Sequence, residues 1–287
     1  MSDQAKRLRQ QFMESSKEKK CKTIAIVSGK GGVGKSNFAV NFSLGLLQKR
    51  KSVLLFDLDV GMGNIDILLG LHAERTVIDM IENRLSVTDI IEDGPHGLAY
   101  ISGGTALTDF FTMDQQSRKY FYEQYQRLVN KYDYIIFDMG AGATSDSMFF
   151  VLASDECIVI TTPEPTSITD AYGMIKHIVN KRQNMPIYIV MNRCRSKKIG
   201  DQSLHKFQQV ITSFLQINTK SLGILPEDKM VSTAVTRQTP YIILNGKSSV
   251  SKALKEIVRH YINEIEGQQH LETITFMQRL TRLLKER

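Results

Sequence analysis

The residues best suited to chemistry form one glycine-rich stretch near the start of the chain. It reads Gly29-Lys30-Gly31-Gly32-Val33-Gly34-Lys35-Ser36 and satisfies the pattern G-x-x-x-x-G-K-S/T. In that pattern, glycines let backbone N–H groups surround phosphates, the lysine reaches the β- and γ-phosphates, and the serine hydroxyl ligates Mg²⁺. The stretch therefore predicts a site for a nucleoside triphosphate and Mg²⁺ that includes Lys35 and Ser36. A glycine-rich turn without a ligand is the alternative.

Such a loop needs a strand before it and a helix after it, and the rest of the chain supplies many of both. Short apolar runs alternate with longer segments of helical periodicity, the rhythm typical of βαβ units. We predict an α/β fold with a doubly wound, mostly parallel sheet and helices on both faces. The predicted strands are Thr23–Ser28, Val53–Asp57, Tyr134–Asp138, Cys157–Thr161, Ile187–Asn192 and Ser221–Leu225, and the predicted helices are 36–50, 114–131, 166–182, 201–216 and 249–265.

A second lysine, Lys30, lies inside the loop, and the resulting Lys-Gly-Gly-Val-Gly-Lys-Ser resembles the MinD/ParA family of deviant Walker-A ATPases over about residues 22–265. The resemblance implies a homodimer when ATP is bound, in which Lys30 reaches the nucleotide of the partner subunit. Its positive charge would offset the negative charge that develops during phosphoryl transfer. A lysine in a solvated loop is the alternative.

The same resemblance assigns two carboxylates. The segment from Asp57-Leu58-Asp59 to Asp66 is similar to the family's switch I, and Asp59 is implied to orient the attacking water. Asp138 ends an apolar run in the Walker-B manner and is implied to hold Mg²⁺ through water, so that the predicted metal site is Ser36, Asp59 and Asp138. Met139–Gly142 resembles switch II, although many relatives have Pro where this chain has Gly140. Turn-forming or strand-ending Asp residues are the structural alternative.

Two features predict the identity of the nucleotide base: the lack of a guanine-binding sequence element and a resemblance to adenine-binding segments. A guanine site typically needs an N-K-x-D element, and Asn180-Lys181-Arg182-Gln183 lacks its carboxylate, so adenine is favoured. Asn192, after one predicted strand, and Pro226, Glu227 and Asp228, after the next, are similar to the family's base-binding segments. Ordinary loops at strand ends are the alternative. The expected cofactors are thus ATP or ADP with Mg²⁺, and hydrolysis is expected to be slow without a stimulating partner.

The last residues of the chain form an amphipathic helical pattern. Within 274–287, one arc of about 120° at 3.6 residues per turn collects the apolar residues Phe276, Met277, Leu280, Leu283 and Leu284. Cationic residues surround this stripe, as in helices that lie at an anionic membrane surface. The pattern and its terminal position match the membrane-targeting helix of MinD-like proteins. A helix docked on its own domain is the alternative.

The first residues carry a second resemblance. Asp3-Gln4-Ala5 with Leu8-Arg9 is similar to the activator element of the FlhG (YlxH) flagellar branch of this family. That branch acts on the GTPase FlhF, with Gln4 implied to assist the GTPase site, and on flagellar switch-complex proteins to set the number and placement of flagella. A solvated basic tail is the alternative. The predicted divisions are 1–20 (activator-like segment), 21–267 (ATPase domain) and 268–287 (membrane helix).

Composition narrows the remaining choices. The net charge of +7, with clustered Lys and Arg at both ends, favours an anionic partner such as a lipid surface. Three separated cysteines without a C-x-x-C pair argue against a disulfide framework or an iron–sulfur carrier. We find no signal peptide and no spanning helix, so the expected location is cytoplasmic, with peripheral membrane contact. A division-site selector of the MinD type and a DNA-partitioning ATPase of the ParA type remain alternatives, although the terminal amphipathic stripe makes DNA an unlikely partner.

Overall fold

The computed structural model of the chain describes residues 21–59, 63–104, 114–142, 145–266 and 275–285. These residues form an eight-stranded sheet in the order β3-β4-β2-β5-β1-β6-β7-β8, in which β3 is antiparallel to β4 and every other pairing is parallel. The strands are β1 (Lys22–Val27), β2 (Val53–Leu58), β3 (Glu92–Asp93), β4 (Ala99–Ile101), β5 (Tyr134–Met139), β6 (Glu156–Thr161), β7 (Ile187–Cys194) and β8 (Lys220–Pro226).

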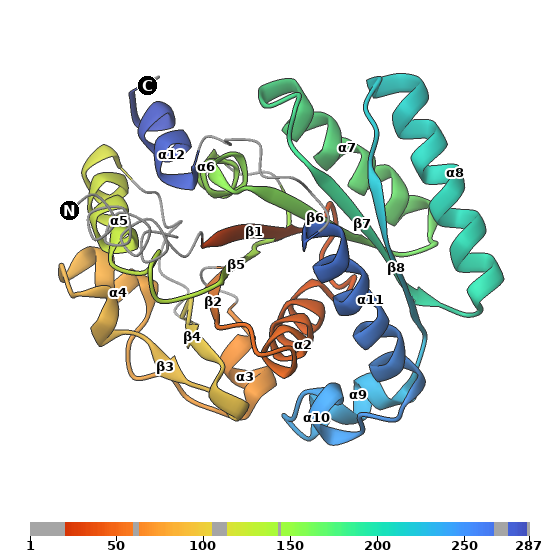
Figure 1. Ribbon diagram of the computed structural model, residues 1–287, viewed down its shortest axis with the longest axis horizontal. Helices are drawn as coiled ribbons and strands as arrows, with labels where there is room; N and C mark the ends of the chain where they lie inside the picture. Colours follow the sequence, from red (N-terminus) through yellow and green to blue (C-terminus); the bar gives the residue numbers. More distant parts are fainter. Residues whose placement is uncertain (1–20, 60–62, 105–113, 143–144, 267–274, 286–287) are drawn as a thin grey trace, which may run out of the picture.

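Helices cover both faces of this sheet, as Figure 1 shows. One face carries α4 (Val77–Glu82), α5 (Gln115–Gln126), α6 (Ser145–Ala153), α7 (Pro165–Lys181), α8 (Lys197–Leu215) and α12 (Phe276–Lys285) over one buried cluster of apolar side chains. The other face carries α2 (Lys35–Gln48), α3 (Ile65–Leu69), α9 (Lys229–Thr236), α10 (Tyr241–Leu244) and α11 (Ser249–Glu266) over a second cluster. The central strands β1, β2, β5, β6 and β7 are buried along most of their length, which explains their continuous apolar runs. The predicted fold class is confirmed.

The shorter strands and helices were not predicted from the sequence. β3 and β4 are only two and three residues long, and α3, α4, α6, α9 and α10 are between four and nine residues long. Each is too short to complete a clear hydrophobic period. The helix predicted over 114–131 ends at Gln126, and the one predicted from 201 already begins at Lys197 with Ser196 as its N-cap. In the described part of the chain, no helix combines the length and the apolar character needed to cross a bilayer.

Candidate functional site

The glycine-rich loop joins β1 to α2 at the carboxyl edge of the sheet. Gly32 and Gly34 have positive φ angles of 76° and 93°, which favour glycine. The loop is also tightly enclosed, because a Cβ atom at Gly29 would lie 2.1 Å from the backbone of Asp170 in α7. Asn192, at the end of β7, donates a hydrogen bond from Nδ2 to the Val33 carbonyl oxygen at 2.8 Å. Two neighbouring elements, α7 and the end of β7, therefore enclose the loop.

Lys35 links the loop to the predicted metal ligands. Its Nζ atom lies 2.6 Å from Asp138 Oδ1, 3.9 Å from Asp59 Oδ2 and 3.4 Å from Ser36 Oγ. Lys35 and Asp138 are both buried. Burial raises the pKa of Asp59, while the charge of Lys35 opposes that rise. The structure thus brings together the four residues for which the sequence predicts catalysis or metal binding, apart from Lys30.

One oxygen at this centre lacks a protein partner. Asp138 Oδ2 is buried and makes no hydrogen bond to any described residue. Native structures rarely leave such an atom unsatisfied, and a bound ion or water usually supplies the partner. Carboxylate and hydroxyl oxygens are the ligands that Mg²⁺ takes, so Asp138 beside Ser36 fits the predicted cation.

Sequence reasoning did not select Asp57, although this residue organises switch I. Its Oδ1 accepts a hydrogen bond from the Asp59 backbone N–H, and its Oδ2 accepts from those of Asn64 and Ile65. Burial, reinforced by the charge of the adjacent Asp138, raises the pKa of Asp57 to about 7. The carboxylate therefore ties both ends of the loop to β2. A carboxylate two residues before Asp59, at the end of a buried strand, was the available signal.

The other residues predicted to bind the nucleotide differ in their exposure and in their hydrogen bonds. Lys30 is exposed, and its Nζ lies 3.2 Å from Thr166 Oγ1 at the start of α7. Pro226 ends β8, and Glu227 follows it at the surface. Asp228 is already used structurally, since it accepts hydrogen bonds from Met230 N–H, the Ser249 hydroxyl and Val250 N–H. It therefore holds the starts of α9 and α11 together.

The predicted membrane helix, α12, is docked on the domain. Phe276 and Leu280 are buried, and the Phe276 ring centroid lies 4.4 Å from that of Tyr125 and 5.6 Å from that of Phe137. Met277 and Leu283 pack partly buried on the same cluster. The alternative, a helix docked on its own domain, therefore describes this structure. The side chain of Leu284, and Gln4 with the whole 1–20 segment, lie outside the described residues.

Arg279 fixes the polar side of α12. Its Nε donates to the Ala153 carbonyl oxygen at 2.7 Å, and its Nη2 forms an ion pair with Asp155. Ala153 ends α6, the helix that follows switch II. The division predicted at residue 268 therefore separates segments that share one core in this structure.

None of the three cysteines offers an obvious metal site. Cys157 and Cys194 are buried in β6 and β7, and burial raises the pKa of the Cys194 thiol to about 11. In the part of the chain that the structure describes, no group of three or more His, Cys, Asp or Glu side chains is arranged to hold a metal ion.

Comparison with known proteins gives consistent results. The ParA family model, described as NUBPL iron-transfer P-loop NTPase, matches residues 19–262. The antiactivator FleN of Pseudomonas aeruginosa is 32% identical over 82% of this chain and 84% of its own. The flagellum site-determining protein YlxH of Helicobacter pylori is 27% identical over 85% and 83%.

A solved structure supports the fold. The septum site-determining protein MinD of Pyrococcus horikoshii OT3, complexed with Mg-ADP, superposes with a TM-score of 0.70 at 24% identity, covering 86% of this chain and 98% of that one. At that identity the likeness concerns the fold alone. The loop between β1 and α2 is the strand–loop–helix unit that a P-loop NTPase requires.

Proposed function

The chain belongs to the MinD/ParA family of P-loop ATPases and is of its FlhG type, and from that membership we propose that it hydrolyses ATP to switch between a free state and a dimeric, membrane-associated state. The observation that carries the proposal is the centre formed by Lys35, Ser36 and the unpartnered oxygen of Asp138. Buried, charged and incompletely satisfied, it has the properties of a ligand site rather than of a structural ion pair.

Each residue of that centre has a role in the proposed reaction. With ATP bound, Lys35 would contact the β- and γ-phosphates in place of Asp138, and Ser36 and Asp138 would hold Mg²⁺, with Asp59 nearby. Bound Mg²⁺ would neutralise charge on the phosphate oxygens. Asp59 orients the attacking water, because its carboxylate lies at the end of β2 next to Lys35. Asp57 keeps Asp59 in place through the backbone bonds that it accepts.

Lys30 contributes only in the dimer in this proposal. Its side chain is exposed and contacts Thr166 rather than the interior of its own loop. It is therefore free to approach the nucleotide of a partner subunit and to stabilise charge there. Asn192, Pro226 and Glu227 are proposed to contact adenine, with Asp228 supporting them through its bonds to α9 and α11.

Membrane association would require α12 to leave its position against α5 and α6. Phe276 and Leu280 face the core, so the stripe that would enter a lipid surface is hidden in this structure. α12 packs on α6, and α6 begins just after switch II. We expect ATP binding and dimerisation to weaken that contact, so that two released helices bind an anionic bilayer together and gain avidity. The protein would then be cytoplasmic when free and peripheral on the inner membrane face when bound to ATP.

The biological role is proposed from the relatives. FleN is named an antiactivator and YlxH a flagellum site-determining protein. We propose that this chain likewise regulates the number and placement of flagella, through an FlhF-type GTPase, with Gln4 in its activation, and through flagellar switch-complex proteins. Intrinsic hydrolysis is expected to be slow, because the described residues of the centre offer positioned charges but no arginine finger.

Sedimentation with anionic liposomes tests the proposal. The wild type should bind in Mg²⁺ with a nonhydrolysable ATP analogue and stay free in Mg-ADP. Deletion of residues 274–287 should abolish liposome binding while leaving ATP binding intact. Binding that does not depend on nucleotide would contradict the switch, and binding of duplex DNA without lipid binding would replace this function with a partitioning one.

A further inference from the structure

Gly140, in switch II, lies directly against the Asp59 side chain of switch I. It follows β5, and a Cβ atom added to it would lie 3.1 Å from Asp59 Oδ1, 3.7 Å from Asp59 Cγ and 3.8 Å from Asp59 Cα. The first of these separations is shorter than most contacts that Cβ atoms make in proteins. The Asp59 carboxylate therefore occupies space that a side chain at position 140 would need.

The backbone of Asp59 is held in place and does not yield easily to such a side chain. Its N–H donates to Asp57 Oδ1 at 3.0 Å, and Asp57 is itself buried and accepts from two further backbone N–H groups of switch I. The Asp59 carboxylate has one oxygen next to Gly140 and the other 3.9 Å from Lys35 Nζ. The room at position 140 thus helps to decide where this carboxylate lies.

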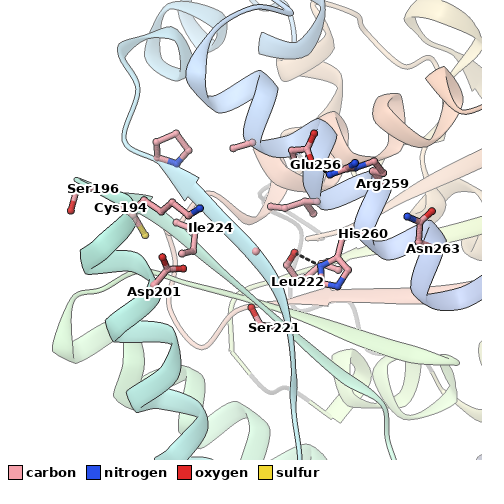
Figure 2. Close-up of a pocket in the computed structure, with 15 residues that line it drawn as sticks. Cys194, Ser196, Asp201, Ser221, Leu222, Ile224, Glu256, Arg259, His260 and Asn263 are labelled. Carbon is pink, nitrogen blue, oxygen red and sulfur yellow. Dashed lines mark hydrogen bonds and ion pairs between the residues drawn. The ribbon is translucent and has the colours of Figure 1, made fainter. Parts of the chain in front are cut away.

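Carboxylates at the surface of the protein are positioned differently. In a groove of about 720 Å³ along β8, between α8 and α11, Asp201 and Glu256 are exposed, and Glu256 pairs with the equally exposed Arg259 (Figure 2). Exposed ion pairs of this kind hold their side chains only weakly. Only 20% of the Asp59 side chain is exposed, so its contacts with the protein set its direction.

Switch II also contacts the P-loop and leads into a helix. The Gly142 N–H lies 3.5 Å from the carbonyl oxygen of Ser28, the residue before the glycine-rich loop, and α6 follows switch II along the chain. A displacement of switch II therefore reaches Asp59 through its contact with Gly140. The same displacement reaches α12 through α6, on which α12 packs.

We propose that Gly140 is a positioning residue for ATP hydrolysis. Because it has no side chain, Asp59 rests against switch II in the direction that orients the attacking water. This inference rests on the proposed function, which makes Asp59 the residue that orients the water. Gly140 acts on kcat through Asp59 and leaves the binding of ATP to the P-loop unchanged.

The test compares two Gly→Ala variants of the full chain. Gly140→Ala should lower kcat about tenfold and change KM for ATP by less than about twofold, because a misplacement of about 1 Å can cost about a hundredfold and this one is smaller. The control Gly173→Ala adds the same methyl group to α7, where no atom lies within 4 Å of it. It should keep both constants within about twofold of wild type, as expected for a substitution without new contacts. Phosphate release measures both constants.

A double variant shows whether the effect passes through Asp59. In an Asp59→Ala background no carboxylate is left to displace, so Gly140→Ala should change the single-turnover rate of hydrolysis by less than about twofold. Urea denaturation without nucleotide gives a second readout. Any stability that Gly140→Ala loses should be regained when Asp59→Ala is added, because the crowding between the two side chains disappears.

The outcomes separate this inference from the proposed function. A wild type that does not hydrolyse ATP would overturn both. Hydrolysis by the wild type with an unchanged kcat in Gly140→Ala would overturn the inference alone, and so would a rise in KM without a fall in kcat. Equal effects of Gly140→Ala with and without Asp59 would show that Gly140 acts through another residue, which also overturns it.

Discussion

The carboxylates at the carboxyl ends of the strands differ from those at the amino ends in how completely they are hydrogen-bonded. We call these two ends the carboxyl edge and the amino edge of the sheet. At the carboxyl edge, Asp57, Asp59 and Asp138 crowd around one lysine, and Asp138 Oδ2 has no partner among the described residues. At the amino edge, Asp155 accepts from Thr23 N–H at 2.8 Å and from the Thr23 hydroxyl at 2.7 Å, and it also pairs with Arg279.

Glu156 is similarly satisfied at the amino edge. It lies 2.6 Å from Lys22 Nζ and accepts a hydrogen bond from the Tyr261 hydroxyl. Both edges are therefore charged and largely buried, but among the described carboxylates only Asp138 has a buried oxygen without a hydrogen-bond partner. Buried polar atoms without hydrogen-bond partners occur in proteins mainly where a ligand completes the site. Polar groups that serve structure alone have all their partners within the protein. The difference separates residues that serve function from those that serve stability.

Replacing one lysine at each edge is the strongest test of that separation. Lys35→Ala should reduce ATP hydrolysis by about a thousandfold, because it removes the side chain proposed to hold the β- and γ-phosphates. Lys22→Ala, the matched control, breaks an ion pair with Glu156 and should leave ATP affinity within about twofold, since the effect of a distant charge is screened. Titration with a fluorescent ATP analogue and an assay of phosphate release measure both. Equal losses in the two variants would contradict the comparison.

The next prediction concerns one residue with two readouts. Asp138→Asn should lower Mg²⁺-dependent hydrolysis by about a hundredfold. It should leave the free energy of unfolding of the nucleotide-free protein within about 1 kcal/mol of wild type, because repulsion with Asp57 disappears while the amide oxygen still accepts from Lys35. Urea denaturation and hydrolysis rates give the two values. A large loss of stability with retained hydrolysis would show that Asp138 is structural.

Much of the fold was predictable because its long strands are buried on both faces and therefore read as apolar runs. All six predicted strands are present within one or two residues of their predicted bounds. β3 and β4 were not found, because two or three residues give no period and their pairing is decided by contacts distant in sequence. The P-loop was predictable because its function is encoded in consecutive residues.

The amino edge was not predictable, because its partners are far apart in the chain. Asp155 and Arg279 are separated by 124 residues, and Glu156 and Tyr261 by 105. The amphipathic pattern of α12 indicated an apolar face but could not decide between a membrane and Tyr125 with Phe137, since both are apolar surroundings. Asp57 was missed because its neighbour Asp59 matched the expected catalytic position.

A moderate effect is expected from loosening α12 on the domain side. Asp155→Asn weakens the ion pair to Arg279 and should raise liposome binding in Mg-ADP, with about 1–3 kcal/mol lost from the free energy of unfolding. The control Asp133→Asn changes another carboxylate of the amino edge, which accepts from Ser52 N–H at 2.6 Å and from the Ser52 hydroxyl at 2.8 Å. That variant should lose stability without gaining lipid binding. If both variants bind liposomes equally, general destabilisation rather than release of α12 is responsible.

The smallest expected effect is a change in pH dependence at Glu156. Burial raises the pKa of this carboxyl above its usual 4.5, although Lys22 opposes the rise. The folded state therefore holds the proton more tightly than the unfolded state, and the free energy of unfolding falls as the pH rises from about 4.5 through the folded-state pKa. Glu156→Gln removes this loss but keeps an oxygen for the Tyr261 hydroxyl. In urea denaturation, the free energy of unfolding of the variant should therefore rise relative to that of wild type as the pH is raised from 5 to 8. No change in this difference between pH 5 and pH 8, with a relative loss of stability by the variant as the pH rises toward 4.5, would mean that Lys22 outweighs burial and that the amino edge stabilises the charged carboxylate.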